Sequence, residues 1–197
     1  MNNKLIKFIE SCELPTEIAN FHLYAFKENS RSTEHLAITL GKFDKSVPVL
    51  ARIHSQCLTG ESLFSLRCDC RFQLTESLKK IAQKGSGVVF YLQQEGRGIG
   101  LLNKVKAYKL QEGGLDTVEA NHHLGFADDI RDYKVVAAIA HHLEINKIDL
   151  MTNNPRKIKA LEENGLIVNK RISISNKATE HNRKYLHTKA KKLGHLI

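Results

Sequence analysis

The chain has 197 residues, of which 42% are hydrophobic, and its formal net charge is +9. A chain of this length buries a core without disulfide or metal staples, so we expect a single domain over residues 1–197, or at most two packed halves. The N-terminal stretch MNNKLIKFIESCELP is too polar for a signal peptide or a membrane span, which predicts a soluble, cytoplasmic protein with no membrane partner.

The first part of the chain predicts an antiparallel sheet. The runs NFHLYAF, EHLAITLGKF and VPVLARIHSQC are rich in Leu, Ile, Val and aromatic residues, and glycine and proline separate them. Beyond residue 71 the pattern changes, because Leu74, Leu78 and Ile81 recur at helical spacing and Gly85 suits the position just past a helix end.

Strands and helices then alternate. The predicted strands are GVVFYLQ, KIDLMTN and LIVNKRISI, and the predicted helices are IGLLNKVKAYKLQEGG, DDIRDYKVVAAIAHHLEI and RKIKALEEN. We expect the second of these helices to begin at Asp128 and Asp129 and to carry Ile130 inward, and the third to begin at Asn154 and Pro155.

This order of elements predicts an α/β fold with mixed α+β character. N-terminal antiparallel strands would join a mostly parallel part in which strands and helices alternate, with helices packed on the sheet and binding sites at the strand-to-helix turns. The segment from about 176 to 197 is expected to form a basic tail with a final helix.

The charge is concentrated toward the C-terminus. From Pro155 onward, 11 basic residues are accompanied by only 3 acidic ones. This excess favours a polyanionic partner, such as nucleic acid, a membrane surface or a phosphorylated small molecule. A solvated basic surface has the same composition and remains the alternative.

Three of the four cysteines lie in the stretch CLTGESLFSLRCDC. Cys68 and Cys70 would point to the same side of an extended segment, and Cys57 would return to them across a turn at Thr59 and Gly60. Because thiols stay reduced in the cytoplasm, this spacing favours Zn²⁺ over disulfides.

The number of protein ligands separates two kinds of zinc site. Structural sites use four, whereas catalytic sites leave one position for water or substrate. Cys12 is distant in sequence, and His54 is too close to Cys57 along a strand, so neither is a convincing fourth ligand. We therefore expect three sulfurs and a water whose pKa falls from about 15.7 to near 7, which predicts hydrolysis. A structural zinc site is the alternative.

Several turns carry groups that suit phosphate. QQEGRGIGLLNK and LMTNNPRKIK each join a strand to a helix N-terminus. The first fits neither the Walker nor the G-x-G-x-x-G pattern, and a tight turn is the alternative explanation of its glycines. Arg97 lies in the first, Thr152 and Lys157 lie in the second, and Arg52 and Ser55 precede the first metal ligand. Together with a hydrolytic zinc, these turns predict a polyphosphorylated substrate.

The segments ARIHSQCLTGESLFSLRCDCRFQL, QQEGRGIGLLNK, AYKLQEGGLDTVEANHHLGFADDIRDY and TNNPRKIKALEENG resemble the GTP cyclohydrolase II family. The resemblance implies an enzyme that opens the imidazole ring of GTP and releases formate and pyrophosphate. The remaining product would be 2,5-diamino-6-ribosylamino-4(3H)-pyrimidinone 5′-phosphate, formed in the first step of riboflavin biosynthesis. The resemblance also implies one Zn²⁺ per subunit, Mg²⁺ and a homodimer.

Carried across motif by motif, the resemblance assigns zinc to Cys57, Cys68 and Cys70. It assigns the catalytic roles to Asp129 as proton acceptor, to Arg131 at the α-phosphorus, and to Tyr108. The residues that it assigns to GTP are Arg52, Ile53, His54, Ser55, Gln56, Gln73, Glu95, Gly96, Arg97, Thr117, Thr152 and Lys157. Gln56 stands where many relatives carry glutamate.

The role of Arg131 has two versions. The family proposal makes it a nucleophile, but a guanidinium with a pKa above about 12 has no free lone pair, so we expect it to stabilise charge instead. Without the resemblance, the sequence predicts that Asp129 and Arg131 form an exposed ion pair in the first turn of a helix.

Two other classes of protein compete with this interpretation. A zinc-containing nucleic-acid-binding module would need aromatic residues for base stacking, and the basic tract offers only Tyr185, so we expect no nucleic-acid partner. A zinc nucleobase deaminase would need H-x-E together with P-C-x-x-C, and this combined signature is absent because the chain has no P-C-x-x-C.

Overall fold

The computed structural model describes residues 5–31, 33–174, 180, 182–194 and 196. The chain divides into two compact units. We call the first the sheet unit and the second the pocket unit. The sheet unit comprises Met1–His54, Leu74–Gln93 and Asp132–Ile174, and the pocket unit comprises Ser55–Gln73, Gln94–Arg131 and Ser175–Ile197.

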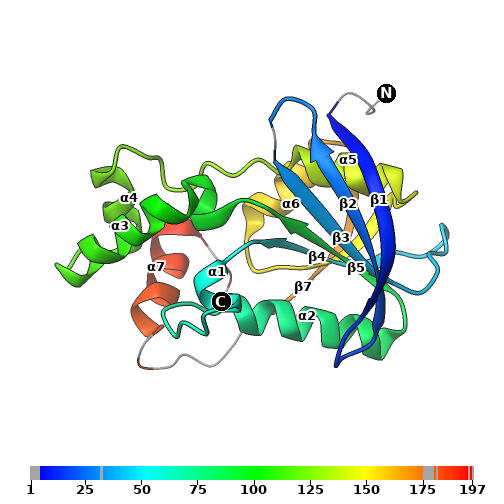
Figure 1. Ribbon diagram of the computed structural model, residues 1–197, viewed down its shortest axis with the longest axis horizontal. Coiled ribbons are helices and arrows are strands. Elements are labelled where there is room, and N and C mark those ends of the chain that lie inside the picture. Colours follow the sequence, from blue (N-terminus) through cyan, green and yellow to red (C-terminus); the bar gives the residue numbers. More distant parts are fainter. Residues whose placement is uncertain (1–4, 32, 175–179, 181, 195, 197) are drawn as a thin grey trace. The chain divides into compact units, whose positions relative to one another are not determined.

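Within the described residues, the sheet unit is built on a seven-stranded sheet in the order β1-β2-β3-β5-β4-β6-β7 (Figure 1). The β1-β2, β2-β3 and β3-β5 pairs are antiparallel, and the β4-β6 and β6-β7 pairs are parallel, so the predicted mixed α/β fold is confirmed. The strands are β1 (Ile6–Pro15), β2 (Asn20–Glu28), β3 (Glu34–Leu40), β4 (Val49–Ser55), β5 (Gly87–Leu92), β6 (Lys147–Met151) and β7 (Ile167–Ile172).

The helices form at the positions where the sequence changes to helical spacing, with a few exceptions. They are α1 (Leu58–Glu61), α2 (Cys70–Lys84), the short 3-10 helix η1 (Glu95–Gly98), α3 (Gly100–Glu112), α4 (Thr117–His123), α5 (Lys134–His142), α6 (Pro155–Glu162) and α7 (Arg183–Leu193). The predicted start of α6 is confirmed, because the Asn154 side chain accepts a hydrogen bond from Arg156 N and Pro155 is the first helical residue. The predicted loop before α7 falls mostly outside the described residues.

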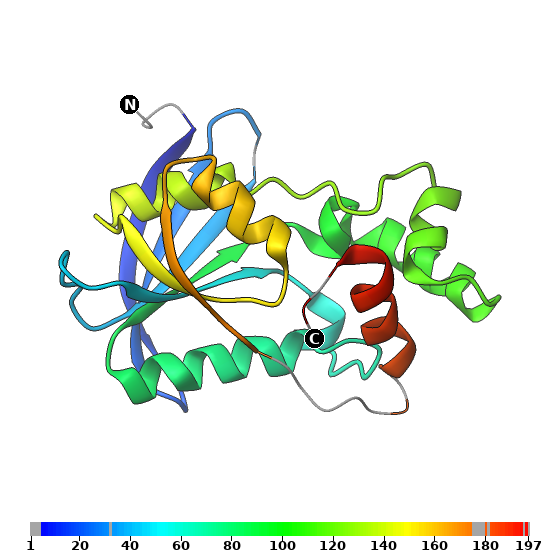
Figure 2. The same cartoon turned by 180° about the vertical axis from the view of Figure 1, so that it is seen from behind.

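The alternation of side chains along the strands fills two apolar cores. On β5, Val88, Phe90 and Leu92 pack in the core that α5 and α6 cover, whereas Val89 packs with Ile81 of α2 in the other core. Figure 2 shows α5 and α6 on one side of the sheet and α2 along the other. The sheet unit is therefore a three-layer structure, with the parallel strands at one side of the sheet.

Helix α5 begins later than predicted. It starts at Lys134, with Tyr133 at the N-cap, and not at Asp128. The reason is local: the Asp129 carboxylate accepts hydrogen bonds from Arg131 and is not free to cap a helix. Ile130, which we expected to face inward, is 47% exposed in this loop, so that prediction is wrong.

Among the described residues, no helix combines the length and the apolar character that a membrane span requires.

Candidate active site

The three clustered cysteines converge in the pocket unit. Cys57 is the N-cap of α1, Cys68 lies in the following loop and Cys70 is the first residue of α2. Their sulfur atoms all lie within 4.8 Å of one another. Cys68 and Cys70 converge because a helix begins between them, and not through the extended segment that we predicted.

The geometry of this cluster fits zinc. Sulfurs at about 2.3 Å from a tetrahedral zinc are about 3.8 Å apart, and Cys57 Sγ and Cys68 Sγ are 3.7 Å apart. Gly60 keeps the space beside them open, since a Cβ at this position would lie 2.7 Å from Cys68 Sγ and 3.1 Å from Cys57 Sγ. Among the described residues no His, Asp, Glu or fourth Cys joins the cluster, and Cys12 lies exposed in the sheet unit.

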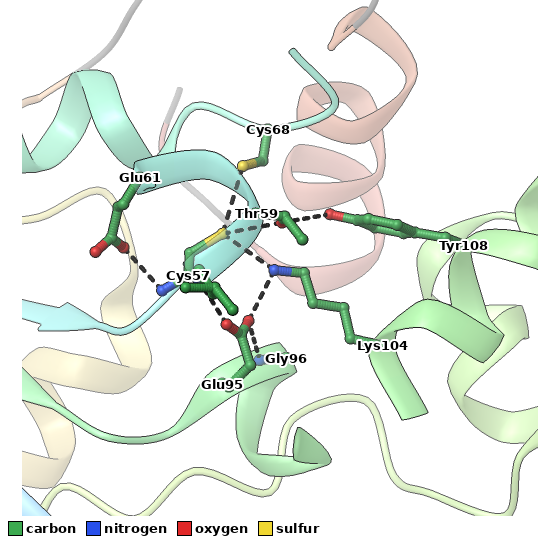
Figure 3. A network of polar contacts seen from close by, with 9 residues as sticks. Cys57, Thr59, Glu61, Cys68, Glu95, Gly96, Lys104 and Tyr108 are labelled. Atoms are coloured by element: carbon green, nitrogen blue, oxygen red, sulfur yellow. Dashed lines mark hydrogen bonds and ion pairs between the residues drawn. The ribbon is translucent and has the colours of Figure 1, made fainter. Parts of the chain in front are cut away.

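Polar contacts surround Cys57 (Figure 3). Lys104 Nζ, from α3, lies 3.1 Å from Cys57 Sγ and 2.7 Å from Glu95 Oε1. The other Glu95 oxygen accepts a hydrogen bond from Leu58 N at 2.7 Å. On the opposite side, Glu61 Oε1 accepts from Cys57 N at 2.8 Å. Both the sulfur and the backbone of Cys57 are therefore fixed.

These contacts change the protonation of the cluster. The hydrogen bond from the Cys68 thiol is the main cause that lowers the pKa of Cys57 far below the usual thiol range, and Lys104 lowers it further. The same hydrogen bond raises the pKa of Cys68 to about 11. Burial alone would lower the pKa of Lys104, but Glu95 and Cys57 raise it overall, so Lys104 carries its charge. The cluster thus holds a thiolate ready for a cation.

Tyr108 lies beside the sulfurs. Its Oη is 3.2 Å from Thr59 Oγ1, which is itself 3.8 Å from Cys57 Sγ. The Arg67 guanidinium lies 4.8 Å from the centre of the tyrosine ring. Burial raises the pKa of Tyr108, so the phenol is protonated and can donate a hydrogen bond or a proton.

The sulfurs line a pocket of the pocket unit with an empty volume of about 690 Å³, including the part that opens to solvent. This size suits a small-molecule ligand. The pocket brings together most of the site residues that we predicted in this unit. Those that line it are Ser55, Gln56, Cys57, Cys68, Cys70, Glu95, Gly96, Arg97, Tyr108, Thr117 and Arg131.

Arg97 is the group in this pocket that most clearly indicates an anion. It follows Gly96 in the turn η1, and both residues have a φ of 62°, in the left-handed region. Within the described part of the chain, its two terminal nitrogens are buried and have no hydrogen-bond partner. The ring of Tyr185, from α7, lies 6.0 Å away. A buried guanidinium without acceptors is costly, and an anionic ligand would satisfy it.

Asp129 and Arg131 form a buried pair. Arg131 Nε and Nη2 donate to the two Asp129 oxygens at 2.8 and 2.6 Å, and Arg131 Nη1 donates to Ser55 Oγ at 3.3 Å. Burial alone would raise the pKa of Asp129, but the paired guanidinium lowers it overall. The pair therefore stabilises the fold above the ordinary aspartate pKa, and this contribution is lost as the pH falls through the lowered pKa.

The two other predicted residues of this unit have supporting positions. Gln73 lies outside the set of residues that line the pocket, and its Nε2 donates to Asp69 Oδ2 at 2.7 Å, in the segment between Cys68 and Cys70. Thr117 is the first residue of α4. A capping box formed by Asp116 and Glu119 stabilises the N-terminus of this helix.

The remaining predicted residues lie in the sheet unit, where the parallel strands β4 and β6 end. Arg52 Nη1 donates to Met151 O at 2.9 Å, and Lys157 Nζ donates to Ile53 O at 2.8 Å. The His54 ring stacks on Tyr91 with 5.7 Å between the ring centres, and Thr152 is buried at the end of β6. The structure brings these five residues, Arg52, Ile53, His54, Thr152 and Lys157, to one end of the parallel strands.

Several residues of the pocket were not predicted from the sequence. Lys104 and Arg67 resemble ordinary surface cations in the sequence, and Tyr185 belongs to a tract that we read as a basic tail. The one local signal was the spacing of Lys104 and Tyr108, which places them on the same face of α3.

Comparisons with known proteins agree with the family resemblance. A family described as "GTP cyclohydrolase II" matches residues 7–173. A protein of Azotobacter vinelandii named GTP cyclohydrolase-2 is 54% identical over 98% of this chain and 92% of its own length. Proteins of the same name from Hahella chejuensis and Pseudomonas aeruginosa are 52% and 50% identical over 98% of this chain and 93% and 94% of their lengths.

A solved structure shares the fold. It is a two-domain 3,4-dihydroxy-2-butanone 4-phosphate synthase from A. baumannii, with a TM-score of 0.54 and 20% sequence identity. The match covers 88% of this chain and 42% of that one, and it supports the fold alone.

Proposed function

This chain belongs to the GTP cyclohydrolase II family, and from that membership we propose that it opens the imidazole ring of GTP by hydrolysis. The products would be formate, pyrophosphate and 2,5-diamino-6-ribosylamino-4(3H)-pyrimidinone 5′-phosphate. The family makes the chain a hydrolase of riboflavin biosynthesis. The observation that carries the proposal is that one pocket is lined both by the three-sulfur cluster and by Arg97, whose two terminal nitrogens have no hydrogen-bond partner among the described residues.

We propose Zn²⁺ as the resident metal, held by Cys57, Cys68 and Cys70. Bound there with an open position, zinc would supply a nucleophile for C8 of guanine at neutral pH. We propose that the phenol of Tyr108, kept protonated by burial, donates a proton to the nitrogen that is released as the ring opens. We also propose Mg²⁺, on the family resemblance alone, as a counter-ion for the triphosphate.

The cations of the pocket would bind the phosphates. Arg97 offers two buried donors, and Arg131 offers a guanidinium that Asp129 and Ser55 hold in one orientation. Because this guanidinium is fixed and charged, its role is to stabilise negative charge at the α-phosphorus and not to attack it. Asp129, with its lowered pKa, orients Arg131 and is a weak proton acceptor while the pair is intact.

The other assignments rest on the family resemblance. We propose that GTP also contacts Ser55, Gln56, Gln73, Glu95, Gly96 and Thr117 from the pocket unit, and Arg52, Ile53, His54, Thr152 and Lys157 from the sheet unit. A single functional domain over residues 1–197, a homodimer and a cytoplasmic location are proposed on the same basis.

The proposal is tested by incubating purified, zinc-loaded protein with GTP and Mg²⁺ and measuring formate and the diaminopyrimidinone product. Cys68→Ser should abolish both products together with zinc binding. Cys12→Ser, which changes the exposed cysteine of β1, is the matched control and should leave both unchanged. Absence of formate from the zinc-loaded protein would refute the proposed reaction.

A further inference from the structure

We propose that Lys104 is a positioning residue that fixes the sulfur of Cys57 for metal binding, and that Glu95 holds Lys104 in place for this role. The proposal uses the metal-site part of the proposed function but does not depend on GTP as the substrate. Neither residue has a place in the three-cysteine ligand set.

The position of Lys104 is unusual for a lysine. Helix α3 also carries Lys109, whose side chain is 84% exposed, whereas the Lys104 side chain is 11% exposed. Burial of a flexible ammonium costs free energy unless strong acceptors surround it. Lys104 Nζ has two such acceptors within 3.1 Å, Glu95 Oε1 and Cys57 Sγ. One is a carboxylate, and the other is a sulfur of the metal cluster.

The charge of the cluster explains why an ammonium is useful there. Three thiolates around one divalent cation leave an excess of negative charge in a partly buried pocket. A hydrogen bond from a cation to one sulfur reduces this charge and fixes the direction of the sulfur lone pairs. Lys104 makes this contact with Cys57, the most buried of the three cysteines.

Glu95 holds the Lys104 ammonium in place. Its Oε1 also accepts a hydrogen bond from Gly96 N at 2.9 Å, and its Oε2 accepts from Leu58 N at 2.7 Å. One carboxylate therefore ties the ammonium of α3 to the backbone next to Cys57 (Figure 3). The carboxylate accepts three hydrogen bonds from the chain itself, so it is held in place between α3 and the segment that carries Cys57.

The first experiment compares zinc affinity among three variants by competition with a chromophoric chelator. Lys104→Met should weaken zinc binding by about 10- to 100-fold, the usual effect of losing a group that supports a metal ligand. Lys104→Arg keeps a charge and N–H donors and should lie closer to wild type. Lys109→Met, the exposed lysine of the same helix, is the control and should match wild type.

A second variant separates metal binding from folding. Lys104→Met alone leaves the Glu95 carboxylate buried without its cation, which can impair folding. The double variant Lys104→Met and Glu95→Gln removes both charges, so its thermal unfolding should be closer to wild type. It should still bind zinc about tenfold or more weakly, because Cys57 has lost its donor. In the cobalt-substituted protein, its thiolate-to-cobalt absorption should be shifted relative to wild type.

The outcomes are distinct. A folded double variant with wild-type zinc affinity and an unchanged cobalt spectrum would overturn the role of Lys104, whatever the activity toward GTP. If zinc affinity falls as expected while the wild-type protein forms no formate from GTP, the positioning role stands and the proposed reaction fails.

Discussion

Two sets of buried polar side chains, one in each unit of the molecule, have different partners. In the sheet unit, Arg52, Asn153 and Lys157 are buried and donate to backbone carbonyls, so they join neighbouring segments of the fold. In the pocket unit, two buried nitrogens of Arg97 have no hydrogen-bond partner within the described residues, and Cys57 shares its sulfur with a cation and other sulfurs. The first pattern stabilises a scaffold, and the second keeps interactions available for ligands.

The backbone shows the same contrast. The sheet unit consists of regular strands and helices with two apolar cores, whereas the pocket unit places successive left-handed residues, Gly96 and Arg97, at its binding turn. A non-glycine residue in this region costs about 1 to 2 kcal/mol, and such strain accumulates at functional sites. Mutations in the apolar cores of the sheet unit should therefore lower stability, whereas mutations at the Gly96–Arg97 turn of the pocket unit should weaken ligand binding.

The most severe test concerns Gly60. In Gly60→Ala the new Cβ would lie 2.7 Å from Cys68 Sγ, so the sulfurs cannot keep their positions. We expect zinc content and formate release to fall to the level of Cys68→Ser, as measured by metal analysis and product assay. Gly113→Ala is the control, because Gly113 has an ordinary φ of −78° and lies at the end of α3. Full zinc content in Gly60→Ala would contradict the proposed metal geometry.

A mutation in the core of the sheet unit should lower stability and leave zinc binding unchanged. Leu150 on β6 is fully buried, and Leu150→Ala should lower the free energy of unfolding by about 2 to 5 kcal/mol through loss of packing and creation of a cavity. Denaturant titration measures this change. At a temperature where the variant is folded, its zinc affinity should equal that of wild type, and a weakened zinc site would show that the two units are not separable in this way.

Arg97→Gly should separate stability from binding within the pocket unit. The substitution removes two buried guanidinium nitrogens that have no acceptor in the described part of the chain, and glycine adopts the left-handed φ of 62° at no steric cost. The free energy of unfolding should stay the same or rise by about 1 kcal/mol. The KM for GTP should rise roughly 10- to 100-fold, the value of a charge-assisted hydrogen bond. Arg97→Lys should retain part of the affinity, and an unchanged KM in Arg97→Gly would exclude phosphate contact at this residue.

The smallest effect is expected at Tyr185. Its ring lines the pocket near Arg97, and Tyr185→Leu keeps the apolar bulk but removes the aromatic face. We expect the KM for GTP to rise about two- to fivefold, as befits a weak cation–π contact. Tyr185→Phe retains the aromatic face and serves as the control. If both variants behaved alike in steady-state kinetics, the contact with Arg97 would have no role in binding.

The regular elements could be predicted because their signals are local. Leu74, Leu78 and Ile81 mark α2, and Asn154 and Pro155 mark the start of α6, without any information from distant residues. The start of α5 could not be predicted in this way, because the Arg131 side chain pairs with the Asp129 carboxylate that we expected to cap the helix. The strand β1 and the short helices α1 and α4 were also absent from our predictions.

The residues of the site also differ in whether their signal in the sequence is local. Cys57, Cys68 and Cys70 could be grouped from their spacing, because they are close in sequence. Lys104 could not be distinguished from Lys109, because the two lysines differ only in their surroundings in the folded chain. Lys104 contacts Cys57 and Glu95, whereas Lys109 is exposed and pairs with Glu112 of the same helix. Residues that act through long-range contacts are visible only in the folded chain.

The sequence separation of these contacts has a consequence for how the protein is made. Cys57 and Lys104 are 47 residues apart, and Leu58 and Glu95 are 37 apart, whereas the sulfurs of Cys57 and Cys68 come from positions 11 apart. During synthesis all three cysteines are added before Glu95 and Lys104 and leave the ribosome before them. A metal ion captured by the nascent chain would first be held by sulfur alone, and the arrival of α3 would then slow its escape.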